Sequence, residues 1–405
     1  MSWKKVKFGS LYKIDSRNGL TKPSKVRGEG YNMINMGELF SYDRIYNIPM
    51  ELVPLKDSEK INAKVEVGDL LFARQSLVLE GAGKCSIVME TSDLTVFESH
   101  IIRIRLKSEE NPLFYYYYFK SPLSPVSTIV SQCAQAGIRG SDLSNLEVIC
   151  PSKDIQDKIV DILSAYDNLI ENNQKQIQLL EEAAQRLYKE WFIDLRFPGH
   201  ENVEIVDGVP EGWHINRADY YFKITIGKTP SRAEKQWFAN SGEGTPWISI
   251  SDMGEAGAFA FYSKEDLTAD AILRHNMKIV PKGTILVSFK LTIGRVVITG
   301  ADMCTNEAIA HFYIDNDLDR AYTYCYLKNF EYDSLGNTSS ISKAINSKII
   351  KSMPFIMPTR DILGQFSMIV QPILNQIELK QKMIFRLTEA RDRLLPKLMS
   401  GEIEV

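Results

Sequence analysis

The sequence predicts an α+β protein in which two mixed α/β domains are separated by two long coiled-coil helices, with an internal pseudo-twofold repeat. Three observations support this fold class: a long-period repeat, a heptad seam in both copies of the repeat, and strand-like runs between them. A chain of 405 residues is also long for one compact domain. We expect four segments, namely a mixed domain at 1–150, a helix at 151–197, a second mixed domain at 198–357 and a second helix at 358–405.

The repeat is clearest in the two helical segments. Pro151 and Asp154 recur 207 positions later as Pro358 and Asp361. Further matches at the same offset are Ile155 and Ile362, Asn168 and Asn375, Ile170 and Ile377, Glu171 and Glu378, Leu180 and Leu387, Glu182 and Glu389, Arg186 and Arg393, and Leu187 and Leu394. So many matches at one offset indicate a duplicated unit. We therefore expect the two halves of the chain to share one fold.

Each helical segment carries a heptad seam. Apolar positions recur in steps of three and four residues from Ile155 to Trp191, with one stutter, and the same seam runs from Ile362 to Leu398. This periodicity is typical of a coiled coil. Pro372 predicts that the second helix starts late or bends, because proline cannot donate its backbone hydrogen bond. The alternative is that both segments are ordinary core helices. Residues expected at the interface between the helices or with a partner are Ile159, Ile162, Ile177, Leu180, Leu187, Trp191, Phe366, Ile369, Ile384, Leu387, Leu394 and Leu398.

The segments between the helices contain matching strand-like runs. Residues 69–73, 86–89 and 100–106 in the first domain correspond to 284–288, 295–299 and 308–312 in the second. Each run is short, mainly apolar and bounded by turn residues, which predicts strands. A short helix follows at 113–120 and again at 322–328.

The composition excludes several classes of protein. Hydrophobic residues make up 44% and charged residues 24%, as in ordinary globular proteins. No uncharged apolar run approaches 18 residues, so no membrane helix is expected, and Met1–Lys7 lacks the apolar stretch of a signal peptide. Five cysteines, scattered and odd in number, favour a reducing cytoplasm. The net charge of −3 requires any DNA binding to come from local basic patches.

A search for catalytic motifs finds none that is complete. The five histidines form no H-x-x-x-H pair and there is no C-x-x-C, so no metal site is expected. Gly81–Cys85 is similar to a phosphate loop but lacks the upstream glycine and the hydroxyl residue after Lys84. Asn111–Phe114 resembles an amino-methyltransferase motif but departs from it at Leu113, and we expect Pro112 to open a helix instead. We therefore predict no catalytic residue, no metal and no cofactor in this chain.

Basic residues in loop-like stretches point to recognition of DNA. Lysines and arginines cluster between Lys4 and Arg27, a stretch in which Asp15 is the only acidic residue. Corresponding cations recur in the second domain. Such clusters can neutralise phosphates, and loops on a rigid scaffold often carry binding residues. The alternative is a solvated charged face. The candidate residues in these loops are Lys22, Ser24, Lys25, Arg27, Lys228, Thr229, Ser231 and Arg232.

Arg74 and Lys290 follow matching strands and are candidates for reading bases, as is Arg139 in the loop Gly137–Gly140. Lys84, Arg295 and Lys343 complete the set of candidates.

Several stretches resemble one known family. Gly227–Ser231 and Pro246–Asp252 are similar to the opening of its target-recognition domains, and Asn18–Ser24 occupy that position in the first domain. Gly137–Gly140, which contains Arg139, resembles the closing strand-loop of such a domain. Ala183–Phe192 and Arg393–Ile403 resemble the central and C-terminal conserved regions. On these residues the whole chain resembles the specificity subunit of a type I restriction-modification system.

The resemblance implies a non-enzymatic DNA reader. Each target-recognition domain would bind one half of a split DNA site, and the two helices would pack antiparallel and act as a ruler between them. Two methyltransferase subunits carrying S-adenosylmethionine would dock on the chain and flip an adenine from each half-site. Restriction and translocase subunits would complete the assembly. The alternatives are a DNA methyltransferase with built-in recognition domains and a helical scaffold with no role on DNA.

Overall fold

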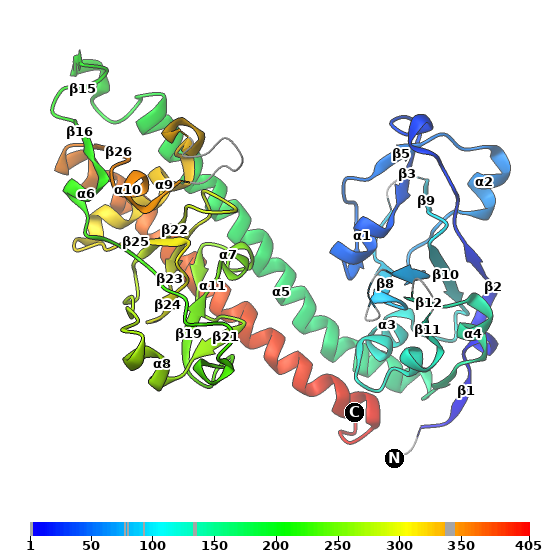
Figure 1. Cartoon of the computed structure of the whole chain (residues 1–405). Helices are drawn as coiled ribbons and strands as arrows, with labels where there is room; N and C mark the ends of the chain where they lie inside the picture. The colour runs from blue at the N-terminus through cyan, green and yellow to red at the C-terminus, as the bar shows by residue number, and fades with distance from the viewer. Residues whose placement is uncertain (1–2, 77, 79–80, 92–93, 133–135, 337–344) are drawn as a thin grey trace. The chain divides into compact units, whose positions relative to one another are not determined.

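The computed structural model describes residues 3–76, 78, 81–91, 94–132, 136–336 and 345–405. The chain forms two compact units (Figure 1). Unit 1 combines Met1–Leu169 with Arg386–Val405, and unit 2 is the continuous stretch Ile170–Phe385. Among the described residues, none of the helices combines the length and the apolar character needed to cross a bilayer. The boundaries of the four segments expected from the sequence remain a prediction.

Unit 1 contains a five-stranded sheet in the order β2-β10-β6-β8-β4. Its strands are β2 (Tyr12–Asn18), β10 (Ile101–Leu106), β6 (Leu70–Ala73), β8 (Cys85–Val88) and β4 (Arg44–Ile45). Smaller sheets pair β5 (Glu51–Val53), β3 (Tyr31–Ile34) and β9 (Thr95–Phe97); β11 (Ser131–Gln132), β12 (Ala136–Gly137) and β7 (Gln75–Ser76); and β1 (Lys5–Lys7) with β13 (Glu147–Ile149). The helices of this part are α1 (Met36–Ser41), α2 (Asp57–Asn62), α3 (Pro112–Lys120) and α4 (Gly140–Asn145).

Unit 2 repeats this topology, with its five-stranded sheet in the order β17-β25-β22-β23-β20. Its strands are β17 (Ile224–Ile226), β25 (Ile309–Phe312), β22 (Ile285–Ser288), β23 (Val296–Thr299) and β20 (Phe259–Ala260). The second sheet has the order β18 (Phe238–Asn240), β21 (Glu265–Leu267), β19 (Thr245–Ile248) and β24 (Cys304–Thr305). Two-stranded pairs join β16 (His214–Arg217) to β26 (Pro354–Met357) and β14 (Ile205–Val206) to β15 (Val209–Pro210). The helices are α6 (Ala218–Tyr221), α7 (Ile250–Glu255), α8 (Ala269–Arg274), α9 (Asp317–Asn329) and α10 (Ser347–Lys351).

The central strands of both sheets are buried on both faces. All four residues of β6 are buried, as are all four of β22, which explains why these strands are continuous apolar runs rather than alternating ones. Their pairing is equivalent in the two units, since Leu70 lies opposite Ile104 and Ile285 lies opposite Phe312. The six strands that we expected from the sequence are confirmed.

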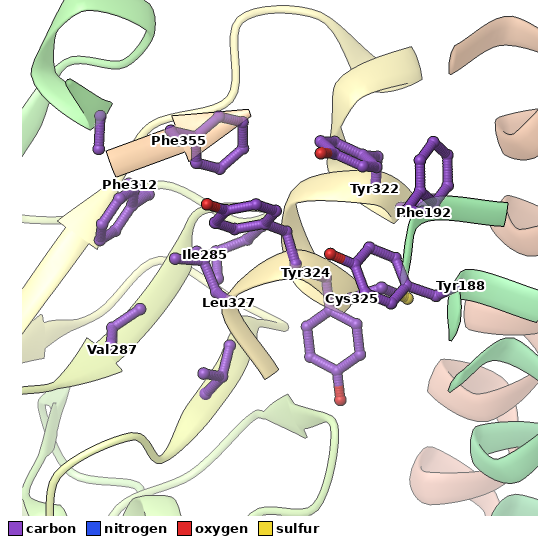
Figure 2. Packing of buried hydrophobic residues seen from close by; sticks show 14 of the residues in the cluster. Tyr188, Phe192, Ile285, Val287, Phe312, Tyr322, Tyr324, Cys325, Leu327 and Phe355 are labelled. Atoms are coloured by element: carbon purple, nitrogen blue, oxygen red, sulfur yellow. The ribbon is translucent and has the colours of Figure 1, made fainter. Parts of the chain in front are cut away.

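A helix rich in tyrosine covers each sheet. In unit 2 the ring of Tyr322 on α9 lies 4.7 Å from that of Phe192, measured between centroids. Figure 2 shows Tyr188 and Phe192 beside α9, with Phe312 and Phe355 from two strands on its other side. The end of the first long helix is therefore part of the core of unit 2.

Both long helices are present where the heptad seam predicts them. α5 spans Lys153–Tyr188 and continues as a π-helical turn, η5 (Lys189–Ile193), and α11 spans Arg360–Ser400. Within unit 2, Tyr188 packs against Phe366, whereas Gln176 accepts a hydrogen bond from Lys380. Residue numbers rise along α5 from 176 to 188 while those of the contacting residues on α11 fall from 380 to 366, so the two helices run antiparallel there.

The late start expected for the second helix is wrong, because α11 begins at Arg360 and passes through Pro372. Pro372 and Met368 are both exposed. The carbonyl of Met368, which a proline four residues later leaves without its helical donor, therefore lies on the side of the helix that faces solvent.

Candidate nucleic-acid interface

In unit 2 the loop after β17 is held tightly against the connection between β24 and β25. The backbone amide of Gly227 donates to the carbonyl of Ile309 at 3.2 Å, and that of Lys228 donates to Thr305 at 3.0 Å. A Cβ atom on residue 227 would lie 2.2 Å from the carbonyl oxygen of Asn306. Glycine is therefore required for this close approach, and it presents the side chains of the loop from a defined backbone.

Glu307 is the centre of a cluster of predicted DNA-binding residues. Its carboxylate accepts a hydrogen bond from the hydroxyl of Thr229. Partial burial raises the pKa of Glu307, but the hydrogen bond from Thr229 and the positive charges of Lys290 and Arg232 lower the pKa below its usual value overall. Two candidates from the loop after β17 and a third from a distant segment thus act on one ionised carboxylate.

The guanidinium of Arg232 is held by aromatic rings on one side and by a carboxylate on the other. It lies 4.4 Å from the ring centre of Phe238 and 4.5 Å from that of Trp247, and its Nη1 is 2.5 Å from Glu265 Oε2. Stacking on aromatic rings leaves the edge of the guanidinium available for planar hydrogen bonding. Lys228 is exposed, with its Nζ 3.3 Å from the carbonyl of Asn276, and Ser231 is also exposed.

Unit 1 builds the equivalent loop around Gly19. The backbone amide of Gly19 donates to Ile101 and that of Leu20 donates to Phe97, which is the pattern of Gly227 and Lys228 in unit 2. Gly19 and Gly227 are 208 positions apart, whereas Pro23 and Pro230 are 207 apart. The first loop therefore holds one more residue between its glycine and its proline, which accounts for its departure from the glycine-threonine-proline-serine pattern.

The cations of this first loop divide into paired and exposed groups. Lys22 Nζ lies 2.8 Å from Glu59 Oε2, and this hydrogen bond is the main cause of the lowered pKa of Glu59. Arg27 Nη1 lies 2.6 Å from Glu51 Oε2. Lys25 and Ser24 are exposed. Of the three predicted cations in this loop, Lys25 is therefore the one whose charge faces solvent.

A small sheet brings Arg74 and Arg139 together. β7 follows Arg74 and β12 precedes Arg139, and the two strands are antiparallel. The amide of Ile138 donates to the carbonyl of Arg74 at 2.9 Å. Arg139 is exposed, and Arg74 Nη1 lies 3.4 Å from the carbonyl of Ser99. Two predicted base-reading residues, 65 positions apart in the sequence, thus flank neighbouring strands at the same end of the pair.

Lys84 and Arg295 occupy equivalent positions and both contact a short helix. Each follows a glycine with a left-handed backbone, Gly83 or Gly294. Lys84 Nζ donates to the carbonyl of Phe40 on α1 at 2.7 Å, and Arg295 Nη1 donates to that of Ile250 on α7. These contacts give both cations a role in the fold, and their role on DNA stays a prediction. Lys343 lies outside the described residues.

The predicted interface residues of the long helices differ in burial. Ile159, Trp191, Phe366 and Leu398 are buried in the cores of their units, and Ile177, Leu180, Leu187, Ile384, Leu387 and Leu394 are partly buried. Ile162 and Ile369 are 36% and 47% exposed. Neither residue belongs to the core of its own unit, and the predicted role of both at an interface between the helices or with a partner stays a prediction.

Two residues of this site were not predicted from the sequence: Glu307, and Leu291, which lies next to Lys290 in the loop between β22 and β23. An acidic residue among cations was a signal that could have been used for Glu307, but the cations lie in other segments. Among the described residues, no group of three or more histidine, cysteine or acidic side chains is placed to hold a metal ion.

Comparison with known proteins decides the family. The model of the type I restriction modification DNA specificity domain matches residues 1–182 and again 210–389, which is most of the chain. The chain belongs to this family of DNA specificity subunits. The match occurs twice, in agreement with the internal repeat, and the protein has a role in DNA sequence specificity within a type I restriction-modification system.

Several specificity subunits from other organisms are similar to this chain over most of its length. The MjaIX specificity subunit of Methanocaldococcus jannaschii is 28% identical over 72% of this chain and 69% of its own length. The HindI specificity subunit of Haemophilus influenzae is 27% identical over 64% of this chain and 70% of its own length. The crystal structure of a type I S subunit from M. genitalium has the same fold, with a TM-score of 0.62 at 17% identity over 98% of this chain and 96% of that one.

Proposed function

We propose that the specificity subunit reads a bipartite DNA target, one half-site with the mixed domain of unit 1 and the other with that of unit 2. The observation that carries this proposal is the repeated loop arrangement. Gly19 and Gly227 make equivalent backbone hydrogen bonds and begin loops that carry Lys25, Lys228 and Arg232. Two domains that share one loop backbone but carry different side chains suit two half-sites of different sequence.

The candidate residues fall into two chemical groups. Lys25 and Lys228 are flexible, exposed cations that suit phosphates, where they contribute affinity without sequence information. Arg74, Arg139 and Arg232 have planar guanidinium groups that suit the edge of guanine in the major groove. The ring contacts of Arg232 support this assignment, because they hold its plane in place before DNA binds.

The catalytic steps belong to other subunits in this proposal. Two methyltransferase subunits carrying S-adenosylmethionine bind the specificity subunit, and restriction and translocase subunits join them. Membership of the specificity family supports this division of labour. The exposed Ile162 and Ile369 are candidates for contacts with those partners.

The two long helices join the mixed domains and set the spacer between the half-sites in this proposal. Adding four helical residues to each long helix at the boundary of the units, after Leu169 in α5 and before Arg386 in α11, would displace the second domain by up to about 6 Å. Both half-site sequences should survive, and the permitted spacer should lengthen or recognition should be lost. A change of bases within a half-site at constant spacer would contradict the ruler role.

The deciding experiment exchanges residues 198–357 for the equivalent segment of another specificity subunit and maps methylated bases in cells that contain the methyltransferase partner. One half-site should change and the other should remain. Change in both half-sites, or in neither, would contradict the proposal. Binding of S-adenosylmethionine by the purified chain alone would favour a methyltransferase with built-in recognition. Failure to bind random duplexes at low salt, even with partner subunits, would favour a scaffold.

A further inference from the structure

The loop between β22 and β23 exposes a leucine at its tip. Leu291 is 88% exposed, and its backbone has a φ of 60°, in the left-handed region. Residues other than glycine, asparagine and aspartate rarely adopt this conformation, which costs roughly 1–2 kcal/mol. A large apolar side chain in this backbone, surrounded by solvent, contributes nothing to the core of unit 2.

The loop is nevertheless well anchored at its base. The hydroxyl of Ser288 donates to the carbonyl of Thr292 at 2.5 Å and accepts from the amide of Arg295 at 3.0 Å. The amide of Gly294 donates to the carbonyl of Ser288 at 2.9 Å. Phe289 is buried and Ile293 packs against the core. The residues on both sides of Leu291 thus hold the tip in place.

The surroundings of Leu291 indicate what it contacts. The preceding residue, Lys290, lies close enough to Glu307 for its charge to lower the pKa of that carboxyl, and Arg232 does the same. The amide of Phe289 donates to Ala308 at 3.0 Å, which fixes the start of the loop beside Glu307. An exposed aliphatic tip within a group of cations matches DNA, in which charged phosphates surround apolar base faces and thymine methyl groups.

We infer that Leu291 makes the apolar base contact of the half-site read by unit 2. This inference rests on the proposed function, because it assumes that the cluster around Glu307 faces DNA. Two modes share this chemistry: contact with a thymine methyl group in the major groove, and insertion between stacked bases, as apolar wedges do. In both modes Leu291 adds sequence-dependent affinity. Because leucine is uncharged, it neutralises no phosphate.

The test uses the specificity subunit bound to its methyltransferase partner and duplexes that carry the mapped target. Leu291→Asn keeps a residue that tolerates the left-handed backbone, and Leu291→Ala shortens the side chain. Leu273→Ala is the matched control, because Leu273 is a leucine of the same unit that is 78% exposed on α8. Both Leu291 variants should bind the target roughly 10- to 100-fold more weakly, as expected for loss of one base contact. Leu273→Ala should bind like the wild type.

Two further readouts separate a base contact from other roles. The slope of log affinity against log salt should stay unchanged in the Leu291 variants, whereas Lys290→Ala should reduce it by about 1 if that lysine touches phosphate. Affinity for non-specific duplexes should also stay unchanged, and thermal unfolding should show that Leu291→Asn folds. Replacing thymine with uracil in the half-site detects a methyl contact, and 2-aminopurine fluorescence detects unstacking by insertion. The inference is supported if uracil weakens binding of the wild type but not of Leu291→Ala. It is also supported if the wild type, but not Leu291→Ala, changes the 2-aminopurine fluorescence.

Target affinity of Leu291→Asn within about twofold of wild type, or an equal loss on non-specific duplexes, would overturn the inference. So would an effect confined to the half-site read by unit 1. If the methylation map shows no bipartite target, the proposed function itself has failed. A bipartite target that the Leu291 variants still bind normally removes only the role of Leu291.

Discussion

Units 1 and 2 share one order of strands but fill equivalent buried positions with different chemistry. At the crossing of the long helices, unit 1 has the ion pair of Asp167 with Arg391, at 2.6 Å. The residues 207 positions away are Leu374 and Ala184, both buried in the core of unit 2. Equivalent positions of the two long helices are therefore occupied once by an ion pair and once by buried apolar side chains.

A second difference lies on two equivalent strands, β10 in unit 1 and β25 in unit 2. Arg103 on β10 and His311 on β25 lie opposite Leu71 and Leu286 in equivalent registers. Arg103 is buried, and its Nη1 donates to the carbonyl of Lys64 at 2.8 Å. Burial also lowers the pKa of Arg103.

His311 is also buried, and its two ring nitrogens lie 2.8 Å from Thr225 Oγ1 and 2.7 Å from Thr305 Oγ1. Burial, with a smaller contribution from the charge of Lys278, lowers the pKa of His311 to about 3. The imidazole is thus neutral at physiological pH, and only unit 2 carries such a group at this position.

The largest effect should come from breaking the charged crossing of unit 1. Asp167→Leu leaves Arg391 partly buried without its main partner and removes the acceptor of the Tyr117 hydroxyl, so the free energy of unfolding should fall by about 3–5 kcal/mol. Adding Arg391→Ala reproduces the chemistry of unit 2 and should recover most of the loss. Urea unfolding of both single variants and the double variant, analysed as a double-mutant cycle, measures this coupling.

Glu389→Ala serves as the control, because it breaks only the exposed pair with Arg393 on the same helix and should cost less than about 1 kcal/mol. A double variant as unstable as Asp167→Leu alone would show that the two crossings are not interchangeable.

The next effect tests a feature that the two units share. Gly19→Ala and Gly227→Ala place a Cβ atom within 2.0 and 2.2 Å of a carbonyl oxygen, so each unit should lose about 1–3 kcal/mol of stability. Each variant should also weaken the half-site read by its own unit. Hydrogen exchange of the strands β10 and β25 locates the loss, and Gly37→Ala, with open space around it, should cause none. If a single substitution accelerates hydrogen exchange equally in β10 and β25, the two units are not independent.

A pH titration should sharpen the difference at His311. The folded protein binds fewer protons than the unfolded chain between pH 6.5 and about 3, so the stability from neutral His311 is complete above pH 6.5 and is lost as the pH falls. The slope is about 1.4 kcal/mol per pH unit, or about 2 kcal/mol lost at pH 5. His311→Gln keeps hydrogen-bonding groups for both threonines and removes the titration. Parallel curves of unfolding free energy against pH for the two proteins would refute this assignment.

The smallest effect concerns the exposed lysines. Lys25→Ala and Lys228→Ala should each reduce the slope of log affinity against log salt by about 1 and weaken specific and non-specific duplexes equally. Lys22→Ala removes an ion pair with Glu59, so its larger effect should be on the stability of unit 1. Filter binding across a salt series measures the slopes. An unchanged slope for Lys25→Ala would place this residue away from the phosphates.

Long-period features of the fold were predictable from the sequence and short ones were not. The seam located α5 and α11 to within a few residues, because many turns of a helix repeat one signal. The six-residue helices α1 and α2 and the strands of the second sheet carry too few residues to show a period. The seam also placed Ile162 and Ile369 at an interface between the helices or with a partner, and spacing alone does not tell which of these two surfaces a residue serves.

The candidate site was predictable as a set of loops but not as a geometry. The repeat identified both basic loops, because equivalent cations recur in them. Which cations are paired depends on partners far along the chain, such as Glu59 for Lys22 and Glu265 for Arg232. Leu291 is exposed and has a left-handed backbone, and both properties are unusual for a leucine, so the residue type argues against them.

The assembly of unit 1 from both ends of the chain has a consequence for synthesis on the ribosome. Its core includes Leu395, Leu398 and Met399, and the indole of Trp3 donates to the carbonyl of Met399 at 3.1 Å. Unit 2, by contrast, is complete when Phe385 has been added. At about 5–20 residues per second, the stretch Ile170–Phe385 takes roughly 10–40 s to make. The domain that emerges first must therefore wait with part of its apolar surface uncovered, and it is the last to be finished.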